Sequence, residues 1–199
     1  MTTIRQYAVN HCNTEGVRGL SDQIFSTLLP AVGGSLVPCT DIVNVVGASS
    51  IPYLQPAAKA ALEAAVNDKG SRPRLLHAVR TVAQQYLVYY WYRHERCGIT
   101  LAAPPGDSPH ELGIAIDIEN NAQWRAVLAN HRWRWRGPSD PGHFTYIGGG
   151  LDPQIRRENI RAFQQLWNRN NPSDLIDEDG VYGDVETGPR LLASPTEGW

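Results

Sequence analysis

The chain has 199 residues, a formal net charge of −2 at pH 7 and a calculated pI of about 6.3. This length suffices for one globular domain with a sizeable core and a small appendage, whereas two large domains would be crowded. Because the net charge is close to zero, the sequence excludes a global basic field that would hold nucleic acid or an anionic membrane.

We expect a soluble protein without an ordinary export leader. Residues 1–30 contain charged and polar side chains and no apolar run of signal-peptide length. The longest apolar and aromatic stretch, residues 86–92, is too short to span a bilayer. The cysteines Cys12, Cys39 and Cys97 are odd in number, so at least one is unpaired and no disulfide framework is evident. A bridge from Cys12 to Cys39 is one option.

The first part of the chain predicts two helices and a short strand. Residues 1–50 show no strong hydrophobic period and are interpreted as irregular, with a short helix near residues 20–29. Pro56 lies in the first turn of an amphipathic helix that ends before Gly70. Residues 75–79 are then a candidate for a short strand.

A second helix follows directly after this strand. Thr81 and Gln84 have the spacing of a capping box, which predicts a helix over residues 81–96 that stops before Gly98. Arg80 therefore lies at a strand-to-helix corner, from which a side chain can project into a site.

Two further strands carry polar residues on one face. Residues 114–118 alternate between isoleucines on one face and Ala115 and Asp117 on the other. Residues 121–130 have helical spacing, and residues 143–147 alternate again. We therefore expect an α+β fold, in which a small antiparallel sheet carries the site and helices pack around it.

The glycines at residues 148–150 are the best candidate for a linker. They separate a domain of residues 1–147, through a linker of residues 148–151, from a short helical segment of residues 152–193. Asp152 and Pro153 are expected to cap the helix of this segment. Residues 194–199 are interpreted as a frayed tail.

His110, Asp117 and His143 are the candidate metal ligands. His110 and Asp117 are seven residues apart with Gly113 between them, so a loop histidine can fold back onto the face of the strand aspartate. His143 begins the next strand and can close the triangle if the two strands are antiparallel. Two imidazoles and one carboxylate suit a catalytic zinc, which keeps one position open for water. Each residue alone can equally be an unrelated polar residue at a strand end, but the joint pattern is more specific.

Asp140 and Arg80 are the candidate catalytic residues beside this zinc. Asp140 lies three residues before His143, where a turn can hold its carboxylate close enough to accept a proton from the attacking water. Glu111 is the alternative base. Arg80 can stabilise the developing oxyanion or hold a substrate carboxylate. The remaining histidines have no comparable partners and are interpreted as solvent-facing or core-edge residues: His11, His77, His94 and His131.

The joint pattern resembles a known superfamily. The motif consists of Ser108-x-His110-x-x-Gly113-x-Ala115-x-Asp117 followed by Asp140-x-x-His143-Phe144-x-Tyr146. It is similar to that of the zinc D-alanyl-D-alanine carboxypeptidases, a superfamily that includes D-Ala-D-Ala dipeptidases and phage L-alanyl-D-glutamate endolysins. The resemblance implies that the two histidines and Asp117 bind zinc and that Asp140 is the base. It also matches Arg80, with the downstream Gln84, to the family's arginine, and Ser108 to a serine that shapes the substrate pocket.

The resemblance covers about residues 54–147 and has two departures. Many members have Ser-Gly-Tyr before the arginine, where this chain has His77-Ala78-Val79. Many also have glutamate as the base, whereas Asp140 resembles the endolysin-like branch.

The C-terminal segment has a fainter likeness of its own. Its Phe163-Gln164 helix, followed by Asp179-Gly180-Val181-Tyr182-Gly183, is similar to the core of small helical peptidoglycan-binding domains. The alternative is a helical clasp packed on the catalytic domain. The acidic balance of the segment argues against binding to anionic wall polymers.

Tryptophans alternate with arginines over residues 132–136. This alternation fits stacking on nucleic-acid bases, but a strand edge or the wall of a substrate cleft in a hydrolase explains it as well. The candidate substrate-binding residues are Ser108, Gln84 and Tyr146, which lie in the motifs that carry the resemblance, and Trp135 of this alternation.

The sequence thus predicts a zinc metallopeptidase that cleaves a peptide bond in the stem peptide of bacterial peptidoglycan. It would act as a D-Ala-D-Ala carboxypeptidase or as an endolysin-type endopeptidase, with one zinc per chain, as a monomer at the cell wall. The partner would be the stem peptide, not nucleic acid or a membrane, and a phage lysis enzyme would need no leader. The alternatives are a catalytically silent wall-binding protein with a structural zinc and a zinc hydrolase of a non-wall peptide.

Overall fold

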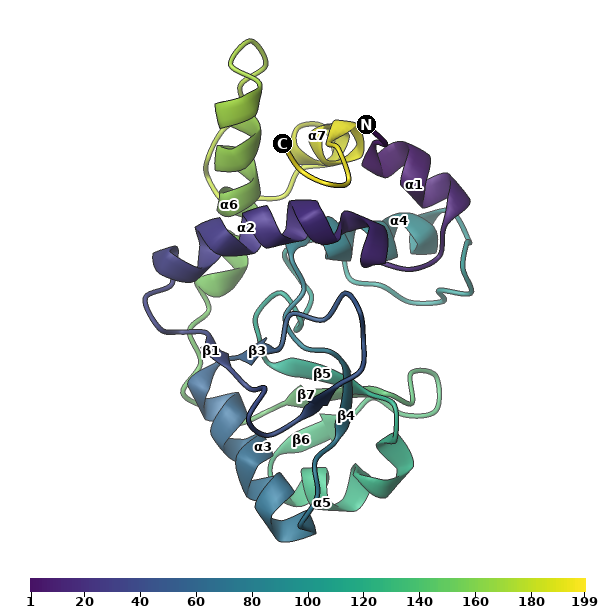
Figure 1. The fold of residues 1–199 in the computed structure, drawn as a ribbon, viewed down its shortest axis with the longest axis vertical. Coiled ribbons are helices and arrows are strands. Elements are labelled where there is room, and N and C mark those ends of the chain that lie inside the picture. The colour runs from purple at the N-terminus through teal and green to yellow at the C-terminus, as the bar shows by residue number, and fades with distance from the viewer. The chain divides into compact units, whose positions relative to one another are not determined.

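The computed structural model describes residues 1–199, and the contacts within the chain divide it into two units. The first unit comprises Met1–Gly33, Thr81–Glu111 and Gln154–Trp199, and the second comprises Gly34–Arg80 and Leu112–Pro153. Each unit therefore combines segments that are far apart in the sequence, as the colours of Figure 1 show. The predicted domain boundary at residues 148–151 concerns independent folding and stays a prediction.

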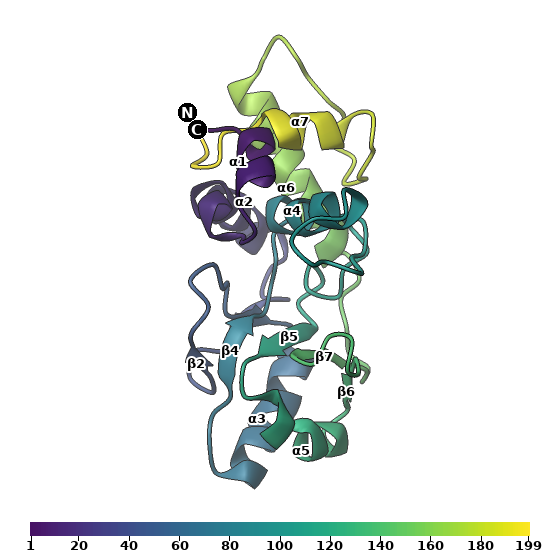
Figure 2. The ribbon, with the colours of Figure 1, turned by 90° about the vertical axis from the view of Figure 1, so that its right-hand side faces the viewer.

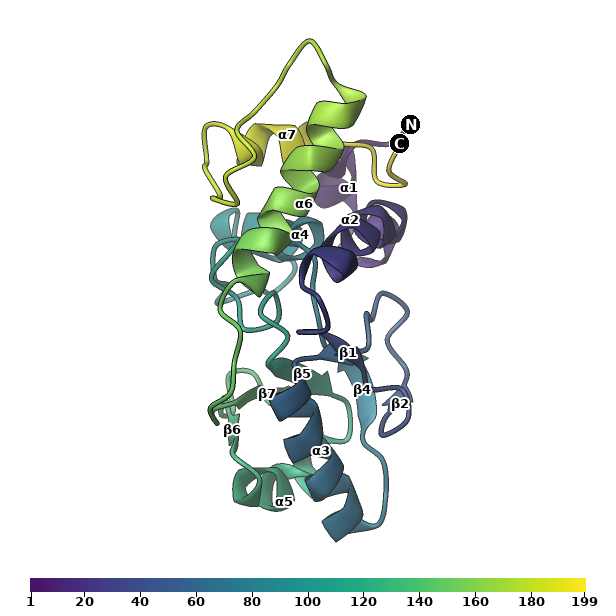
Figure 3. The same ribbon diagram turned by 90° about the vertical axis from the view of Figure 1, so that its left-hand side faces the viewer.

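The first unit is helical. It contains α1 (Ile4–Asn10), a 3₁₀ turn (Glu15–Val17), α2 (Arg18–Ala31), α4 (Val82–Arg93), α6 (Ile155–Asn170) and α7 (Thr187–Ala193). In Figure 2 these helices gather around one another, and Figure 3 shows α6 running beside α2 and α4. The helix predicted near residues 20–29 is confirmed as α2, whereas α1 lies where irregular structure was predicted. Thr3 and Gln6 form a complete capping box at its start.

The predicted capping box of α4 is present in full. Thr81 Oγ1 accepts a hydrogen bond from the Gln84 amide, and Gln84 Oε1 accepts one from the Thr81 amide at 3.1 Å. Thr81 is also buried against α2, where its hydroxyl donates to Ser21 Oγ at 2.9 Å. The helix ends at Arg93, three residues before the predicted end.

The second unit is built around a five-stranded sheet. Its strands lie in the order β2 (Asn44–Val45), β4 (Arg74–His77), β5 (Ala115–Ile118), β7 (His143–Tyr146) and β6 (Trp133–Trp135). The pairs β4–β5, β5–β7 and β6–β7 are antiparallel, as predicted, and β2 adds a parallel pair at the edge. A second sheet joins β1 (Val37–Pro38) to β3 (Tyr53–Leu54). The α+β class is thereby confirmed.

The two faces of the sheet differ. Buried apolar side chains line one face, where α3 (Pro56–Lys69) and α5 (Arg125–Asn130) lie along it (Figure 1). These side chains are Leu75, Ile116, Ile118, Trp133 and Phe144. Gly70 caps α3 in the left-handed conformation, with φ of 67°, as its position after the apolar pattern predicted. The opposite face carries the polar residues of the motifs.

Two predictions about the C-terminal segment are wrong. Asp152 does not cap α6, which begins after Gln154 without a side-chain cap. The Asp152 carboxylate instead accepts a hydrogen bond from Ser35 Oγ at 2.7 Å. The last residues are not frayed either, because the Thr196 amide donates to the Thr2 carbonyl at 2.9 Å and buries this end against the first helix.

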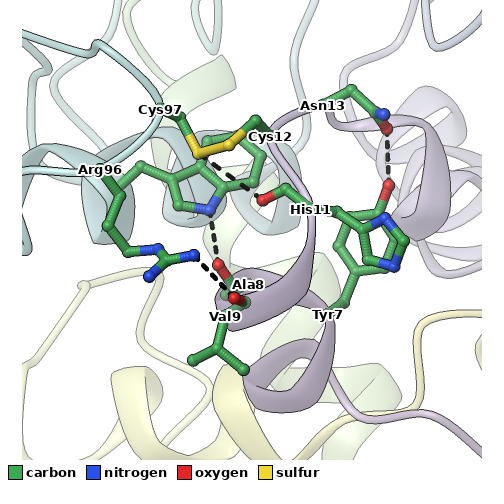
Figure 4. Close-up of a disulfide and its surroundings, with 9 residues drawn as sticks. Tyr7, Ala8, Val9, His11, Cys12, Asn13, Arg96 and Cys97 are labelled. Atoms are coloured by element: carbon green, nitrogen blue, oxygen red, sulfur yellow. Dashed lines mark hydrogen bonds between the residues drawn. A yellow bond between two sulfur atoms is a disulfide. The ribbon is translucent and has the colours of Figure 1, made fainter.

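The cysteine pairing also differs from the option raised from the sequence. Cys12 forms a disulfide with Cys97, and Cys39 is a buried free thiol. The bond joins the segment after α1 to the segment after α4 (Figure 4). Trp91 Nε1 in α4 donates to the Ala8 carbonyl in α1 at 2.9 Å, and Arg96 donates to the Val9 carbonyl at 2.6 Å, so hydrogen bonds also join the last turn of α1 to α4 and the segment after it. No helix of the protein is long and apolar enough to cross a membrane.

Candidate metal centre and active site

The strand register brings motif residues together on the polar face of the sheet. Asp117 on β5 is the direct partner of His143 on β7 and of His77 on β4. Side chains of directly paired residues lie on the same face, so these three groups are neighbours. The antiparallel pairing that the sequence required for a metal site is therefore present.

His110 is held by a compact turn that precedes β5. Its amide donates to Ser108 Oγ at 3.3 Å, and the next residue, Glu111, is fully buried. Glu111 Oε2 accepts hydrogen bonds from the Gly106 amide at 2.8 Å and from the Ser108 amide at 3.3 Å. Burial raises the pKa of Glu111 to about 8. Glu111 thus stabilises the turn that presents His110, which argues against its use as the alternative base.

Gly113 allows the chain to pass from this turn into β5. Its φ of +72° lies in the left-handed region, and a Cβ there would approach Leu36 Cδ2 to 2.5 Å. Any other residue at this position would therefore strain the segment between His110 and Asp117.

His110, Asp117 and His143 form a group that can hold a metal ion. Each offers one ligand atom, and these atoms all lie within 4.8 Å of one another. The two histidines are 1% and 4% exposed, so their imidazoles are already removed from bulk water. A buried set of two nitrogens and one carboxylate oxygen is a donor set that suits zinc.

Three nitrogen-bearing side chains lie close to the carboxylate of Asp117. Arg80 Nη2 lies 2.6 Å from Asp117 Oδ2, His143 Nδ1 lies 3.0 Å from Oδ1, and His77 Nδ1 lies 3.4 Å from Oδ2. The other ring nitrogen of His143 lies 2.9 Å from Thr145 Oγ1. The carboxylate thus lies where cationic and hydrogen-bond-donating groups converge on it.

Asp140 lies in the turn between β6 and β7. Its amide donates to the Gly137 carbonyl at 3.2 Å, and its carbonyl accepts from the His143 amide at 3.2 Å. This turn couples Asp140 directly to a candidate ligand. The residue is exposed, but partial desolvation of its carboxyl group and the nearby Asp117 charge raise its pKa. A raised pKa favours proton uptake by this group.

The four candidate substrate-binding residues are not all near this cluster. Ser108 supports His110, as described above. Gln84 is fully buried, and its side-chain oxygen completes the cap of α4. Tyr146 lies on the apolar face of the sheet, with its ring 5.7 Å from that of Trp133. Trp135 shares that face, because it pairs with Phe144.

Trp135 has a contact that links it to the candidate base. Its Nε1 donates to the carbonyl of Pro141 at 2.9 Å, next to Asp140. The guanidinium carbon of Arg125 lies 3.9 Å from the centroid of the indole ring. The structure therefore makes Trp135 a support of the Asp140 turn.

Sequence reasoning missed two residues of the polar face. His77 was interpreted as having no comparable partner, yet it lies beside Asp117. Its position within the predicted strand of residues 75–79, three residues before Arg80, is the available signal. Thr145 contacts His143, and the alternation of residues 143–147 places both on one face.

Comparison with known proteins finds a family model that matches part of the chain. Residues 53–136 match the family model of VanY, a D-alanyl-D-alanine carboxypeptidase. The match confirms the resemblance to the zinc carboxypeptidase superfamily over a region that includes Arg80, His110 and Asp117 and ends before Asp140 and His143. No curated protein matches the chain. The family is zinc-dependent and implies peptidase activity of the carboxypeptidase type.

Proposed function

We propose that the protein is a zinc metallopeptidase that hydrolyses a peptide bond in the stem peptide of bacterial peptidoglycan. The observation that carries this proposal is the meeting of His110, Asp117 and His143 within 4.8 Å, in a chain whose matched region contains two of them. His143 lies beyond the match, so its position beside Asp117 is independent support from the fold.

His110, Asp117 and His143 are the residues that would hold zinc. When bound at such a site, zinc polarises a carbonyl and lowers the pKa of water toward roughly 7. Asp117 Oδ1 and His143 Nδ1 are already 3.0 Å apart, and Thr145 Oγ1 lies 2.9 Å from the other ring nitrogen of His143, which orients that imidazole. Ser108 Oγ accepts a hydrogen bond from the backbone amide of His110 and so holds the turn that carries it.

Asp140 is the proposed general base and acid. Its carboxylate accepts a proton from the water that attacks the peptide carbonyl, and it then delivers a proton to the departing amine. The turn from Gly137 to His143 fixes its position relative to the ligand. Desolvation, which raises its pKa, strengthens it as a proton acceptor.

Arg80 is the proposed electrostatic group. It lies at the corner before α4, where the capped helix begins, and its guanidinium contacts Asp117. A guanidinium carries five N–H donors and a permanent charge, so it can orient Asp117 and also stabilise an oxyanion or bind a substrate carboxylate.

The presence of Asp140 favours an enzyme over a silent wall-binding protein. A structural zinc site is closed by four protein ligands and uses no base. In this chain the group contains three candidate ligands and a separate carboxylate three residues from the last one. Wall binding by the C-terminal segment rests on its motif alone and is the alternative to the helical clasp.

Digestion of purified peptidoglycan tests the proposal. We expect mass spectrometry to find fragments cut within the stem peptide, activity to disappear with a chelator, and zinc to restore it. His110→Ala should lose both zinc and activity, while the exposed Arg169→Ala serves as the matched control. Wall binding without fragments would instead indicate a silent binding protein, and cleavage only of other peptides would indicate a non-wall hydrolase.

A further inference from the structure

An arginine on the edge strand shares the polar face with the metal-binding group. β6 is the outermost strand of the sheet and pairs with β7. Arg134 on β6 is the direct partner of Thr145, so the two side chains lie on the same face. Thr145 in turn contacts His143 through its hydroxyl at 2.9 Å. Arg134 is therefore one strand away from a candidate ligand of the zinc.

A second arginine continues this line. The amide of Arg136 donates to the carbonyl of His143 at 3.1 Å, so the segment after β6 stays paired with β7. Arg136 lies two residues after Arg134, and alternation places both side chains on the same face. The charge of Arg136 also acts on Asp140. It lowers the pKa of that carboxyl group, whereas desolvation and the charge of Asp117 raise it by more.

No hydrogen bond within the protein holds these two guanidinium groups, although the charge of Arg136 acts on Asp140. Both residues are exposed, and neither side chain forms a hydrogen bond or ion pair. Two other arginines are paired, since Arg74 on β4 bonds to Glu119, and Arg80, which follows β4, bonds to Asp117. Unpaired guanidinium groups beside a reaction centre favour a ligand that supplies the missing carboxylate, because guanidinium binds carboxylates through two parallel hydrogen bonds.

The charge of the polar face of the sheet also favours an anionic ligand. Arg80 contacts Asp117, the charges of Arg80 and Arg136 act on Asp140, and Arg134 lies on the same face of the sheet. Asp117 is a candidate ligand of a doubly charged ion, so it does not offset the arginines once the ion is bound. A face of this sign attracts anionic peptides and repels cationic ones.

We propose that Arg134 and Arg136 bind a carboxylate of the substrate and make the protein selective for anionic peptides. This inference rests on the proposed function and adds a specificity determinant to it. The carboxylate has two sources: the free C-terminus of the peptide, as in a carboxypeptidase, or an acidic residue beside the cleaved bond, as in an endopeptidase.

Four matched peptides distinguish the two sources. The first peptide carries a free C-terminal carboxylate and an acidic residue beside the cleaved bond. In the second the C-terminus is amidated, in the third the acidic residue is replaced by its amide, and the fourth has both changes. The zinc-loaded wild-type protein is compared with Arg134→Gln, Arg136→Gln and the control Arg132→Gln. Arg132 is exposed and lies in the turn before β6, so its substitution removes the same charge farther from His143.

We expect kcat/KM of the wild type to fall roughly 10- to 100-fold when the recognised carboxylate is amidated, the range for one charged hydrogen-bonding partner. Arg134→Gln and Arg136→Gln should lose a similar factor on the carboxylate peptide and should no longer discriminate against the amide. Arg132→Gln should discriminate like the wild type, and zinc content should be equal in all four proteins.

Two results would overturn the inference: variants that still discriminate between carboxylate and amide, or variants that lose the same factor on all four peptides. If the wild type cleaves none of the peptides, the proposed function fails, and calorimetric binding of the same peptides decides the inference. Carboxylate-dependent binding that disappears in Arg134→Gln and Arg136→Gln supports it, whereas equal binding of all four peptides contradicts it.

Discussion

Asp140 has two properties that a general base needs, namely access to solvent and a fixed position. It is exposed in the turn between β6 and β7, and its backbone is held by hydrogen bonds to the Gly137 carbonyl and from the His143 amide. Because the position comes from the backbone, changing the carboxylate to an amide removes the proton acceptor without removing the turn.

We therefore predict that Asp140→Asn keeps its zinc and loses turnover. Hydrolysis should fall by roughly 100- to 10,000-fold, the range for losing a positioned general base. Metal analysis and single-substrate kinetics on the same preparation check both parts. Loss of zinc would make Asp140 a ligand, and near-normal turnover would require another base.

Cys39 shows how burial alone controls reactivity. Its side chain is fully buried, and desolvation raises the pKa of its thiol to about 12, with Lys59 acting in the opposite direction. The thiolate is the reactive form of cysteine. At pH 8 a thiol of this pKa is ionised in only about one molecule in ten thousand.

We predict that iodoacetamide leaves the native protein unlabelled at pH 8 and labels one cysteine after unfolding without reductant. Mass spectrometry should place the label on Cys39, because Cys12 and Cys97 are joined. Rapid labelling of the native protein at Cys39 would show that the region opens readily. Labelling at Cys12 or Cys97 would show that the disulfide had not formed.

The elements differ in how far the sequence determines them. The capping box of α4 and the glycine after α3 are local signals, so both helices were predicted close to their observed bounds. The alternation of β5 and β7 identified the face that carries Asp117 and His143. Local pattern could not identify the pairing of β2 with β4 or the position of His77, because both depend on which strands become neighbours.

The same limit applies to the disulfide. Cys12 and Cys97 are 85 residues apart, and only the packing of α1 beside α4 brings their Cα atoms to 5.3 Å. The bond then closes a long loop, which restricts the unfolded chain strongly. By the chain-entropy relation, closing a loop of this length stabilises the folded state by about 4 to 5 kcal/mol.

We predict that replacing both Cys12 and Cys97 by serine lowers the free energy of unfolding by several kcal/mol, up to this figure. Denaturant titration measures the change. As a control, a reductant should lower the midpoint of the wild type and leave that of the double variant unchanged. Equal midpoints for the two proteins under oxidising conditions would show that the bond contributes nothing. A disulfide of this kind persists in oxidising surroundings, which fits the proposed action at the cell wall.

On the scale of the whole molecule, the C-terminal segment is part of the helical unit. Residues from Gln154 to Trp199 belong to the same unit as Met1–Gly33 and Thr81–Glu111. α6 packs along α2, and Asn159 Oδ1 accepts a hydrogen bond from the Val82 amide at 2.9 Å, inside the first turn of α4. These contacts favour the helical clasp over a separate wall-binding module.

We predict that truncation after Gly150 unfolds the helical unit. It removes Ile160, Phe163 and Trp167, which are all buried, and each such side chain contributes roughly 1.5 to 3 kcal/mol through burial. Three of them approach the whole stability of a typical domain, about 5 to 15 kcal/mol. Circular dichroism of the truncated protein should therefore show a loss of helix beyond that of α6 and α7 themselves.

A point variant tests the same contact without deleting chain. Asn159→Ala leaves the buried Val82 amide without its acceptor, which costs about 1 to 3 kcal/mol, whereas Arg169→Ala on the exposed end of α6 should have little effect. If the truncated protein keeps its remaining helices and still cleaves small soluble peptides, but no longer binds the insoluble wall, then residues 152–193 are a wall-binding module. The hydrogen bond between α6 and α4 would then be incidental to the stability of the rest.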